Sequence, residues 1–388
     1  MPNFHQVFEK RSEPRCYRTT ITPVEAARNK LFEARNKIRK HLIAVIPELT
    51  EKAFGPDGRA VPKFYVQGSW AYDTCNAPCQ DGQEMDLDYG VYLPVSTWEE
   101  SGLPPQHAAK VYFNIIEHAL QPLVKKEGWQ FGEGKETCVR IHLSGINAHV
   151  DVPLYVAPDA EFKRLVEAMA TEALVAKAFD SARAINFAEG EIDEQQWHDF
   201  EKIALAMRDG TWKDSDPRKV SDWFDSSVRR HGEQLRRVCR YLKGMRDFRW
   251  STGGPSSILL MICATKVWQK FDGRDDLALL HVLEHIDSLL IGPVFCPEIS
   301  DEDFNRIKQN ERHDVERWAQ QRASVLRDVI YNSRMHLLDD AFRKLQSIID
   351  HRIEHAPDLV MADTTPPSIR SYAPAVVPQP QHRESRAG

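Results

Sequence analysis

The stretch MDLDYGVYLP, residues 85–94, places two acidic residues inside a pattern that is otherwise typical of a buried β-strand. Alternate positions are apolar: Met85, Leu87, Tyr89, Val91 and Leu93. Because residues i and i+2 of a strand point to the same face, the carboxylates of Asp86 and Asp88 should lie side by side. Two such charges repel and raise each other's pKa unless a cation lies between them. The stretch therefore predicts a strand whose acidic face holds a cation, with a solvated edge strand as the alternative.

Length and composition set the class of protein. With 388 residues, 42% of them hydrophobic and 28% charged, the chain can form two domains or one large one around a substantial core. The net charge of −6 lacks the overall basic character of dedicated nucleic-acid-binding proteins, although a local basic surface is compatible with it. We therefore expect no stable nucleic-acid partner.

Cysteines and apolar runs indicate the compartment. The seven cysteines are scattered, and Cys75 and Cys79 lack a second Cys/His pair at zinc-like spacing, so we expect reduced thiols. The N-terminal MPNFHQVFEKRSEPR lacks the apolar segment of a signal peptide, and the longest apolar run, residues 258–264, is too short to span a bilayer. These features predict a cytoplasmic protein without membrane contact.

The first half of the chain mixes helical and strand patterns. In chain order the patterns predict a helix, a strand with a turn, a strand, a helix and a hairpin, over residues 22–46, 59–70, 84–95, 106–127 and 135–158. We expect a core domain of mixed α/β structure over residues 22–158, preceded by an N-terminal segment of residues 1–21.

The second half has helical periodicity and no strand pattern after about residue 159. The expected helices span residues 162–179, 194–208, 222–246, 256–271, 277–290 and 301–352. We expect a helical domain over residues 159–355 that packs against the first unit. Residues 356–388 are rich in proline and serine with little apolar mass, which predicts a disordered tail.

Two further features favour a functional acidic strand over a solvated one. Gly68 and Ser69 follow a predicted strand and precede a probable helix start, where backbone N–H groups and a hydroxyl can bind phosphate, although an ordinary turn uses the same residues. Asp151 lies in the apolar strand of the hairpin, and burying an aspartate is unfavourable unless it is paired or metal-bound. A hydrogen-bonded structural aspartate is the alternative at that position.

Three carboxylates on adjacent strands suit hard divalent cations. Mg²⁺ binds a few carboxylates together with substrate phosphates, and a pair of such ions can activate an attacking hydroxyl and stabilise a leaving pyrophosphate. We expect Asp86, Asp88 and Asp151 to hold two Mg²⁺ ions, with Mn²⁺ as an alternative, and Asp151 to act also as general base.

Three stretches together resemble a known family: QGSWAYDT at 67–74, QEMDLDYGVYLP at 83–94 and HVDVPLYV at 149–156. They are similar to the signature of polymerase-β-like nucleotidyltransferases. The residues around these motifs are similar to those of the DncV-like branch of the bacterial CD-NTases (cGAS/DncV-like nucleotidyltransferases). The 17 positions from Ser69 to Asp86 include the insertion NAPCQDGQ, which resembles that branch. The resemblance implies an α+β fold, with a polymerase-β-like nucleotidyltransferase core of mixed sheet and helices plus a C-terminal helical region.

The resemblance also implies an activity. Members of the family join NTPs without a template into a cyclic oligonucleotide second messenger and release pyrophosphate, in anti-phage (CBASS) signalling. For this chain it implies ATP and GTP as substrates, a cyclic purine dinucleotide such as cyclic GMP-AMP as product, and a downstream effector that senses the product.

The helix predicted over residues 222–246 carries cations. Arg236, Arg240 and Lys243 share one face, which suits a triphosphate but also an ordinary solvated face. Ser256 or Ser257 is expected to cap the apolar helix that follows. The resemblance implies that Lys243 contacts the donor triphosphate and that Ser257 completes the triphosphate site.

Four residues are expected around the nucleotide bases. Ser215 and Asp216 precede Pro217 and resemble a helix cap, and the resemblance implies that they contact a base edge. Tyr72 and Arg140 are as bare residues more typical of structural roles, and the resemblance implies that they contact the acceptor nucleotide by stacking or, for Arg140, by pairing with phosphate.

Two other functions fit the same residues. A polymerase-β-like enzyme that tails RNA would need a basic groove for the RNA backbone. The cationic helix is compatible with such a groove, whereas the acidic net charge argues against it. A nucleotide-binding sensor or scaffold without catalysis would not need all three acids. The terminal Gly388 is compatible with conjugation by a ubiquitin-like E1/E2 system, as the resemblance implies for relatives.

Overall fold

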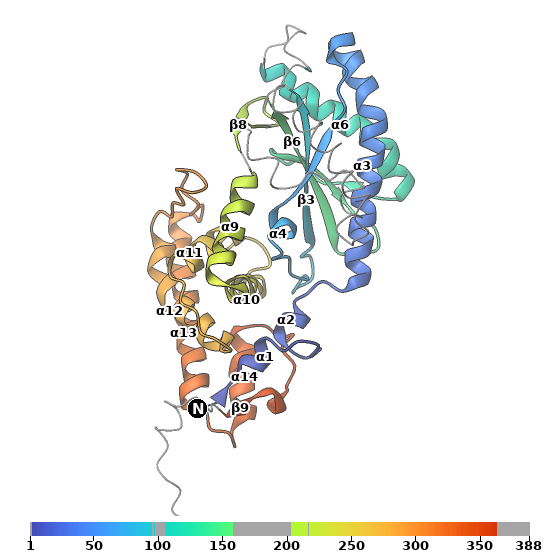
Figure 1. Ribbon diagram of the computed structural model, residues 1–388. Coiled ribbons are helices and arrows are strands. Elements are labelled where there is room, and N and C mark those ends of the chain that lie inside the picture. Colours follow the sequence, from blue (N-terminus) through green and yellow to red (C-terminus); the bar gives the residue numbers. More distant parts are fainter. Residues whose placement is uncertain (1, 95–96, 98–104, 158–202, 216, 363–388) are drawn as a thin grey trace, which may run out of the picture.

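The computed structural model describes residues 2–94, 97, 105–157, 203–215 and 217–362. Its described residues form two parts (Figure 1): a sheet with two long helices at one end of the molecule, and a cluster of helices with the N-terminal segment at the other. The two parts have separate apolar cores. The predicted helix at 162–179, Asp216 and Gly388 lie outside the described residues.

A mixed sheet forms the first part, and its described portion has seven strands in the order β2-β3-β6-β5-β4, extended by β7 and β8 beside β6. The central β3 and β6 are parallel and the other pairs antiparallel. The strand bounds are β2 Lys63–Gln67, β3 Met85–Pro94, β4 Gln130–Phe131, β5 Cys138–His142 and β6 Ala148–Ala157. The predicted strands and the predicted hairpin are confirmed.

One face of the sheet packs against two long helices, and the other face carries the acidic residues at one end and a small buried cluster that includes Tyr92 and Tyr155 at the other. Helices α3 (Glu25–Phe54) and α6 (Pro105–Glu127) supply the core that contains Leu87 of β3 and Val150 of β6. These two residues are paired in register, so their strand neighbours point to the opposite face. Strand alternation therefore places the acidic residues away from α3 and α6.

The predicted helix at 194–208 is wrong in its described part. Residues Ala204–Ala206 form β7, which pairs with β6, and Trp212–Asp214 form β8, which pairs with β7. Each strand has three residues, too few to produce a period of two in the sequence. Leu205 is buried beside Tyr155, so the sheet edge and not local propensity decides the conformation.

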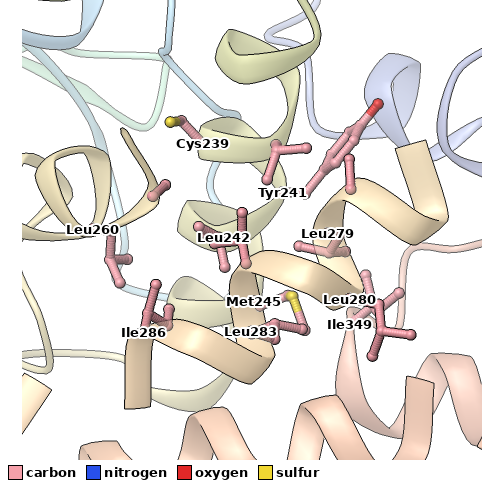
Figure 2. Packing of buried hydrophobic residues seen from close by; sticks show 14 of the residues in the cluster. Cys239, Tyr241, Leu242, Met245, Leu260, Leu279, Leu280, Leu283, Ile286 and Ile349 are labelled. Carbon is pink, nitrogen blue, oxygen red and sulfur yellow. The ribbon is translucent and has the colours of Figure 1, made fainter. Parts of the chain in front are cut away.

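The second part is helical, as predicted. Its helices are α9 Pro217–His231, α10 Glu233–Arg249, α11 Ser257–Lys266, α12 Asp275–Ile291, α13 Arg312–Asn332 and α14 Leu338–Ile348, with the short η3 Gln309–Glu311. Figure 2 shows how Leu242 and Met245 of α10 pack against Leu279 and Leu283 of α12. The single helix predicted at 222–246 is wrong, because Gly232 has a φ of 89° and separates α9 from α10.

The N-terminal segment belongs to the helical part. It forms β1 (Pro2–Asn3), α1 (His5–Phe8) and α2 (Tyr17–Thr20). Phe8 and Tyr17 are fully buried against α10 and the other helices of this core. The segment is thus an integral layer of the helical part.

The predicted disordered tail begins too early. Residues Pro357–Leu359 form a 3-10 turn, η4, and Met361–Ala362 form β9, which pairs with β1. Ala356 and Leu359 are buried in the helical core. A few apolar residues within a proline-rich stretch are enough to anchor it, because the N-terminal strand supplies a pairing partner that is distant in sequence.

The insertion after the Gly-Ser turn connects the two parts of the molecule. The turn forms the short α4 (Gly68–Ala71). Before β2 the chain also forms a short 3-10 helix, η1 (Pro56–Gly58). Asn76 Nδ2 donates to the carbonyl of Arg240 at 2.9 Å, and Gln83 Nε2 donates to the carbonyls of Asp247 and Trp250 at 2.9 and 3.1 Å. These bonds fix the α10 side of the molecule next to β3.

All seven cysteines are buried and free, in agreement with the expected absence of disulfides. Among the helices in the described ranges, none is both long and apolar enough to cross a bilayer.

Candidate active site

Strand register brings the three predicted acids together. β3 and β6 run parallel with Asp86 opposite His149 and Asp88 opposite Asp151. All four residues lie on the face that points away from α3 and α6. The side chain of Asp86 is 44% exposed and that of Asp151 is 5% exposed, so the row runs from the surface into the protein.

Asp88 lies at the centre of the row, under the Gly-Ser turn. Burial raises the pKa of Asp88 to about 8, and the negative charges of Asp86 and Asp151 add to the shift. A Cβ atom at Gly68 would lie 2.1 Å from Asp88 Oδ2, and Gly68 has a φ of +65°. Only glycine allows the backbone of the turn to approach this carboxyl so closely.

Asp151 is neutralised by cations instead. Arg140 of β5 donates to it from Nε at 2.6 Å and from Nη2 at 2.7 Å, and Lys135 Nζ donates at 3.1 Å. Burial alone would raise the pKa of Asp151, but the hydrogen bonds and charge of Arg140, helped by His149 and Lys135, hold it below its ordinary value. Arg140, expected at a base or phosphate, thus forms a bidentate pair with a catalytic candidate.

His149 is a site residue that the sequence interpretation missed. Its imidazole is almost fully buried, with Nε2 3.0 Å from Asp86 Oδ1 and Nδ1 2.7 Å from Glu84 Oε2. Burial lowers its pKa, but the hydrogen bond and charge of Asp86 outweigh burial and leave the pKa raised. Its position two residues before Asp151 was the available signal, since i and i+2 share a face. Asp86, His149 and Asp151 together could hold a metal ion, with ligand atoms within 4.8 Å of one another.

Lys243 and Ser69 both act on Cys75, which lies between the Gly-Ser turn and the acidic strand. Burial raises the pKa of the Cys75 thiol, while the charge of Lys243 and a hydrogen bond from Ser69 lower it and the charge of Asp86 raises it. These four side chains therefore share one neighbourhood between β3 and α10. The Gly-Ser turn and the lysine reach the same place from different parts of the chain.

Two cations of the predicted row have other partners. Arg240 is buried and donates to Asn76 Oδ1 at 3.1 Å and to Thr22 Oγ1 at 2.9 Å. Arg236 pairs with Asp225 at 3.0 Å and with Glu233 at 2.6 Å. These arginines join α10 to its surroundings, so the idea that the whole row faces a triphosphate is wrong for them.

The serines before α11 have separate roles. Ser256 is the N-cap, and its side chain accepts a hydrogen bond from the Leu259 backbone at 3.2 Å. Ser257 is the first residue of the helix, and its Oγ accepts from Arg246 Nη2 at 3.3 Å. Ser257 is thus not needed as a cap and has a guanidinium beside its hydroxyl.

The residues expected near the bases are only partly placed. The ring of Tyr72 packs edge to face on Phe224 of α9, with centroids 6.4 Å apart, and burial together with the charge of Asp88 raises its pKa. Ser215 follows β8, and its backbone N–H donates to the carbonyl of Ile203 at 3.2 Å. Tyr72 therefore lies near the acidic row, whereas Ser215 is placed by a backbone hydrogen bond to another described residue. Asp216 lies outside the described residues.

Two family models match the two parts of the chain. The model "Cyclic GMP-AMP synthase DncV-like, nucleotidyltransferase domain" matches residues 62–155, and "Cyclic GMP-AMP synthase, C-terminal domain" matches residues 232–362. The first range includes the whole acidic row and the second includes Lys243 and Ser257. The chain belongs to the DncV-like nucleotidyltransferases.

Curated relatives of this DncV-like chain carry the name cyclic GMP-AMP synthase. The protein of that name from Vibrio cholerae serotype O1 is 37% identical over 250 residues, which are 62% of this chain and 56% of that protein. The one from Escherichia coli (strain TW11681) is 34% identical over 250 residues, 63% of this chain and 54% of that protein. The matched region thus spans about half the length of these relatives.

Solved structures confirm the DncV-like fold. The crystal structure of Vibrio cholerae DncV cyclic AMP-GMP synthase superposes with a TM-score of 0.75 at 24% identity, over 94% of this chain and 100% of that chain. The same protein with the linear intermediate pppA(3',5')pG gives a TM-score of 0.74 at 25% identity, over 94% and 99%. The predicted α+β class, with a mixed sheet and a helical region, is confirmed.

Proposed function

We propose that this protein is a template-independent nucleotidyltransferase that joins ATP and GTP into a cyclic purine dinucleotide, such as cyclic GMP-AMP, and releases pyrophosphate. The observation that carries the proposal is the parallel register of β3 and β6, which gathers Asp86, Asp88 and Asp151 on one face. The relatives named cyclic GMP-AMP synthase support a cyclic product. The complex of the Vibrio cholerae protein with a linear intermediate supports joining in two steps.

The donor set fits hard divalent cations. Asp86 and Asp88 offer carboxylate oxygens, the ligands that Mg²⁺ and Mn²⁺ prefer. The raised pKa of Asp88 marks a position where an added positive charge is favourable. We infer that these residues hold two Mg²⁺ ions, with Asp151 completing the set. When bound, such ions neutralise the charge of a triphosphate and favour ionisation of the acceptor hydroxyl.

Asp151 is our candidate to receive the proton of the acceptor hydroxyl. Arg140 and Lys135 keep its carboxylate ionised but lower its pKa, so it becomes an effective base only when Arg140 turns away from it. Arg140 must release one of its two hydrogen bonds for Asp151 to gain another partner. Its planar guanidinium can then pair with a phosphate or stack on a base of the acceptor nucleotide.

The remaining candidates bind the donor triphosphate and the bases. Gly68 and Ser69 offer backbone N–H groups and a hydroxyl beside Asp88, and Lys243 offers a positive charge near Cys75, the thiol that Ser69 also contacts. Ser257 adds a hydroxyl at the start of α11, next to Arg246. Tyr72, Ser215 and Asp216 remain the candidates for base recognition.

Product analysis tests the proposal. Purified protein with Mg²⁺, ATP and GTP should form a phosphatase-resistant product with the mass of a cyclic dinucleotide, and the Asp86→Ala/Asp88→Ala double variant should form none. An RNA of defined length in the same reaction tests RNA tailing. A lengthened RNA without a cyclic product would contradict the proposal, and nucleotide binding without turnover would indicate a non-catalytic sensor.

We further propose the cellular setting that the family resemblance supports. The product would act as a second messenger in anti-phage (CBASS) signalling inside the cytoplasm, where a downstream effector senses it. The catalytic core would span residues 22–158 extended by β7 and β8, and the helical domain would span residues 217–362 together with the N-terminal segment. A tail that ends in Gly388 would be the substrate of a ubiquitin-like E1/E2 system, so that removal of residues 385–388 blocks conjugation and leaves activity in vitro unchanged.

A further inference from the structure

Two histidines and a glutamate converge at the edge of the acidic row. Glu84 Oε2 lies 2.9 Å from His142 Nδ1 and 2.7 Å from His149 Nδ1. Their potential ligand atoms all lie within 4.8 Å of one another. The proposed reaction assigns no role to Glu84 or His142, so the cluster requires its own account.

The backbone of the sheet sets this arrangement. His142 of β5 and His149 of β6 are directly paired in the antiparallel ladder, and their rings lie 5.7 Å apart at 61°. Glu84 immediately precedes β3, where Asp86 is paired with His149. Residues on adjacent, hydrogen-bonded strands keep their relative positions, so little conformational freedom is lost when they bind an ion together.

The cluster has the chemistry of a transition-metal site. Two imidazole nitrogens and one carboxylate suit Zn²⁺ and its neighbours, whereas Mg²⁺ prefers an all-oxygen set. The side chains of His142 and Glu84 are 37% and 29% exposed, and that of His149 is 7% exposed. One side is therefore open to solvent, so that an ion can enter and water can complete a tetrahedral shell.

We propose that Glu84, His142 and His149 bind a transition-metal dication, Zn²⁺ in the first instance, at a site separate from the carboxylate pair Asp86 and Asp88. The simpler account is that Glu84 only orients the two imidazoles by hydrogen bonds. The two accounts differ in whether the wild type binds an ion at the cluster, and whether that binding is lost when His142 is replaced.

His149 would connect this site to the acidic row. A metal on Nδ1 leaves the ring proton on Nε2, which lies 3.0 Å from Asp86 Oδ1. Metal-bound histidines commonly direct their other ring N–H towards a carboxylate, which orients the ring. Zinc on Nδ1 would therefore favour the ring orientation in which Nε2 faces Asp86.

Zinc titration of the full chain tests the site. Calorimetry is run with Zn²⁺ alone as the ligand, in saturating Mg²⁺ so that the all-oxygen site is occupied, and Co²⁺ absorption in the visible range reports nitrogen ligands. Four proteins are compared: the wild type, His142→Ala, Asp151→Asn, and His336→Ala as a control at an exposed histidine elsewhere. Thermal melting verifies that each is folded.

We expect the wild type, Asp151→Asn and His336→Ala to bind one equivalent with similar affinity, and His142→Ala to bind at least about 100-fold more weakly, beyond the loss caused by an outer-shell change. If His142→Ala does not fold, Glu84→Gln takes its place with the same expected loss. Equal binding by the wild type and His142→Ala, no binding by the wild type, or a loss only in Asp151→Asn would each overturn the proposal.

Discussion

Each part of the molecule holds a carboxylate that is at least half-buried, and the pKa shifts of the two differ in sign. In the helical part Asp275, the first residue of α12, is fully buried and accepts two hydrogen bonds from Arg237 at 2.7 and 2.8 Å. Gln234 and Tyr241 add further bonds at 3.0 Å. Burial alone would raise its pKa, but Arg237 and the other donors lower it. The charge and the hydrogen-bonding capacity of this carboxylate are therefore satisfied by the protein itself.

In the sheet Asp88 has the opposite surroundings. Across the strands it is paired with Asp151 of β6 and Gln67 of β2, and burial with the charges of Asp86 and Asp151 raises its pKa to about 8. No side chain forms an ion pair with Asp88 among the described residues, so a bound cation is needed to neutralise the repulsion among the three carboxylates. The contrast separates a carboxylate that stabilises the fold from one that is held ready for a ligand.

The largest expected effect is on activity at Asp88. We expect Asp88→Asn to lower the rate of dinucleotide formation by on the order of 10³-fold or more, as for residues of a catalytic unit. Thermal stability should stay equal or rise, because the repulsion from Asp86 and Asp151 is removed. Rates are measured by quantifying the product, and Asp81→Asn, an exposed aspartate of the inserted loop, is the matched control. A fully active Asp88→Asn would refute the assignment.

The reverse result is expected at Asp275. Asp275→Ala leaves Arg237 without its buried partner and should lower the free energy of unfolding by about 3–5 kcal/mol. The folded fraction should retain its activity per molecule, because α12 lies in the helical core away from the acidic row. Urea unfolding at pH 7 measures the change. Unchanged stability would mean that Asp275 and Asp88 do not differ as described.

A smaller loss of activity is expected at the turn above Asp88. Gly68→Ala would place a Cβ atom 2.1 Å from Asp88 Oδ2, and we expect a loss of activity of about 10²-fold, comparable to misplacement of a catalytic group. Gly82→Ala is the matched control, since Gly82 also has a positive φ, of +84°, but a Cβ atom there would have no other atom within 4 Å. Equal losses in both variants would assign the effect to backbone strain alone.

The two carboxylates also predict opposite pH dependence of stability. Asp88 binds its proton more tightly in the folded state, so in metal-free protein its contribution is present at low pH and is lost as pH rises through about 8. Asp275, with its lowered pKa, contributes stability above its unfolded pKa of about 3.9 that is lost in acid. Between pH 5 and 8 we expect wild type to lose on the order of 1–3 kcal/mol relative to Asp88→Asn. Parallel curves for the two proteins would contradict this.

The sequence was informative where the signal was local. Alternation around Asp86 and Asp88, the Gly-Ser turn and the position of Asp151 each need only a few neighbouring residues, and the structure brings all of them together. Helical periodicity likewise located the helical part, but it did not reveal two breaks: Gly232 divides one expected helix, and residues 333–337 separate α13 from α14 within the helix expected at 301–352.

The contacts that the sequence did not reveal depend on partners that are distant along the chain. The pairing of Arg140 with Asp151 and of His149 with Asp86 follows from strand register, which no local pattern specifies. Arg240 lies at helical spacing from Lys243, which suggested a phosphate-binding role, but its guanidinium donates hydrogen bonds to Asn76 and Thr22 instead. The short β7 and β8 form because β6 offers an open edge.

The most direct test of the central claim is the proton released when Mg²⁺ binds. If Asp88 is largely protonated in metal-free protein because its pKa is about 8, binding of the cation at pH 7 must displace that proton. Calorimetry in buffers of different ionisation enthalpy should then give a release approaching one proton per wild-type molecule and close to none for Asp88→Asn. Mg²⁺ binding by the wild type without proton release would contradict the account.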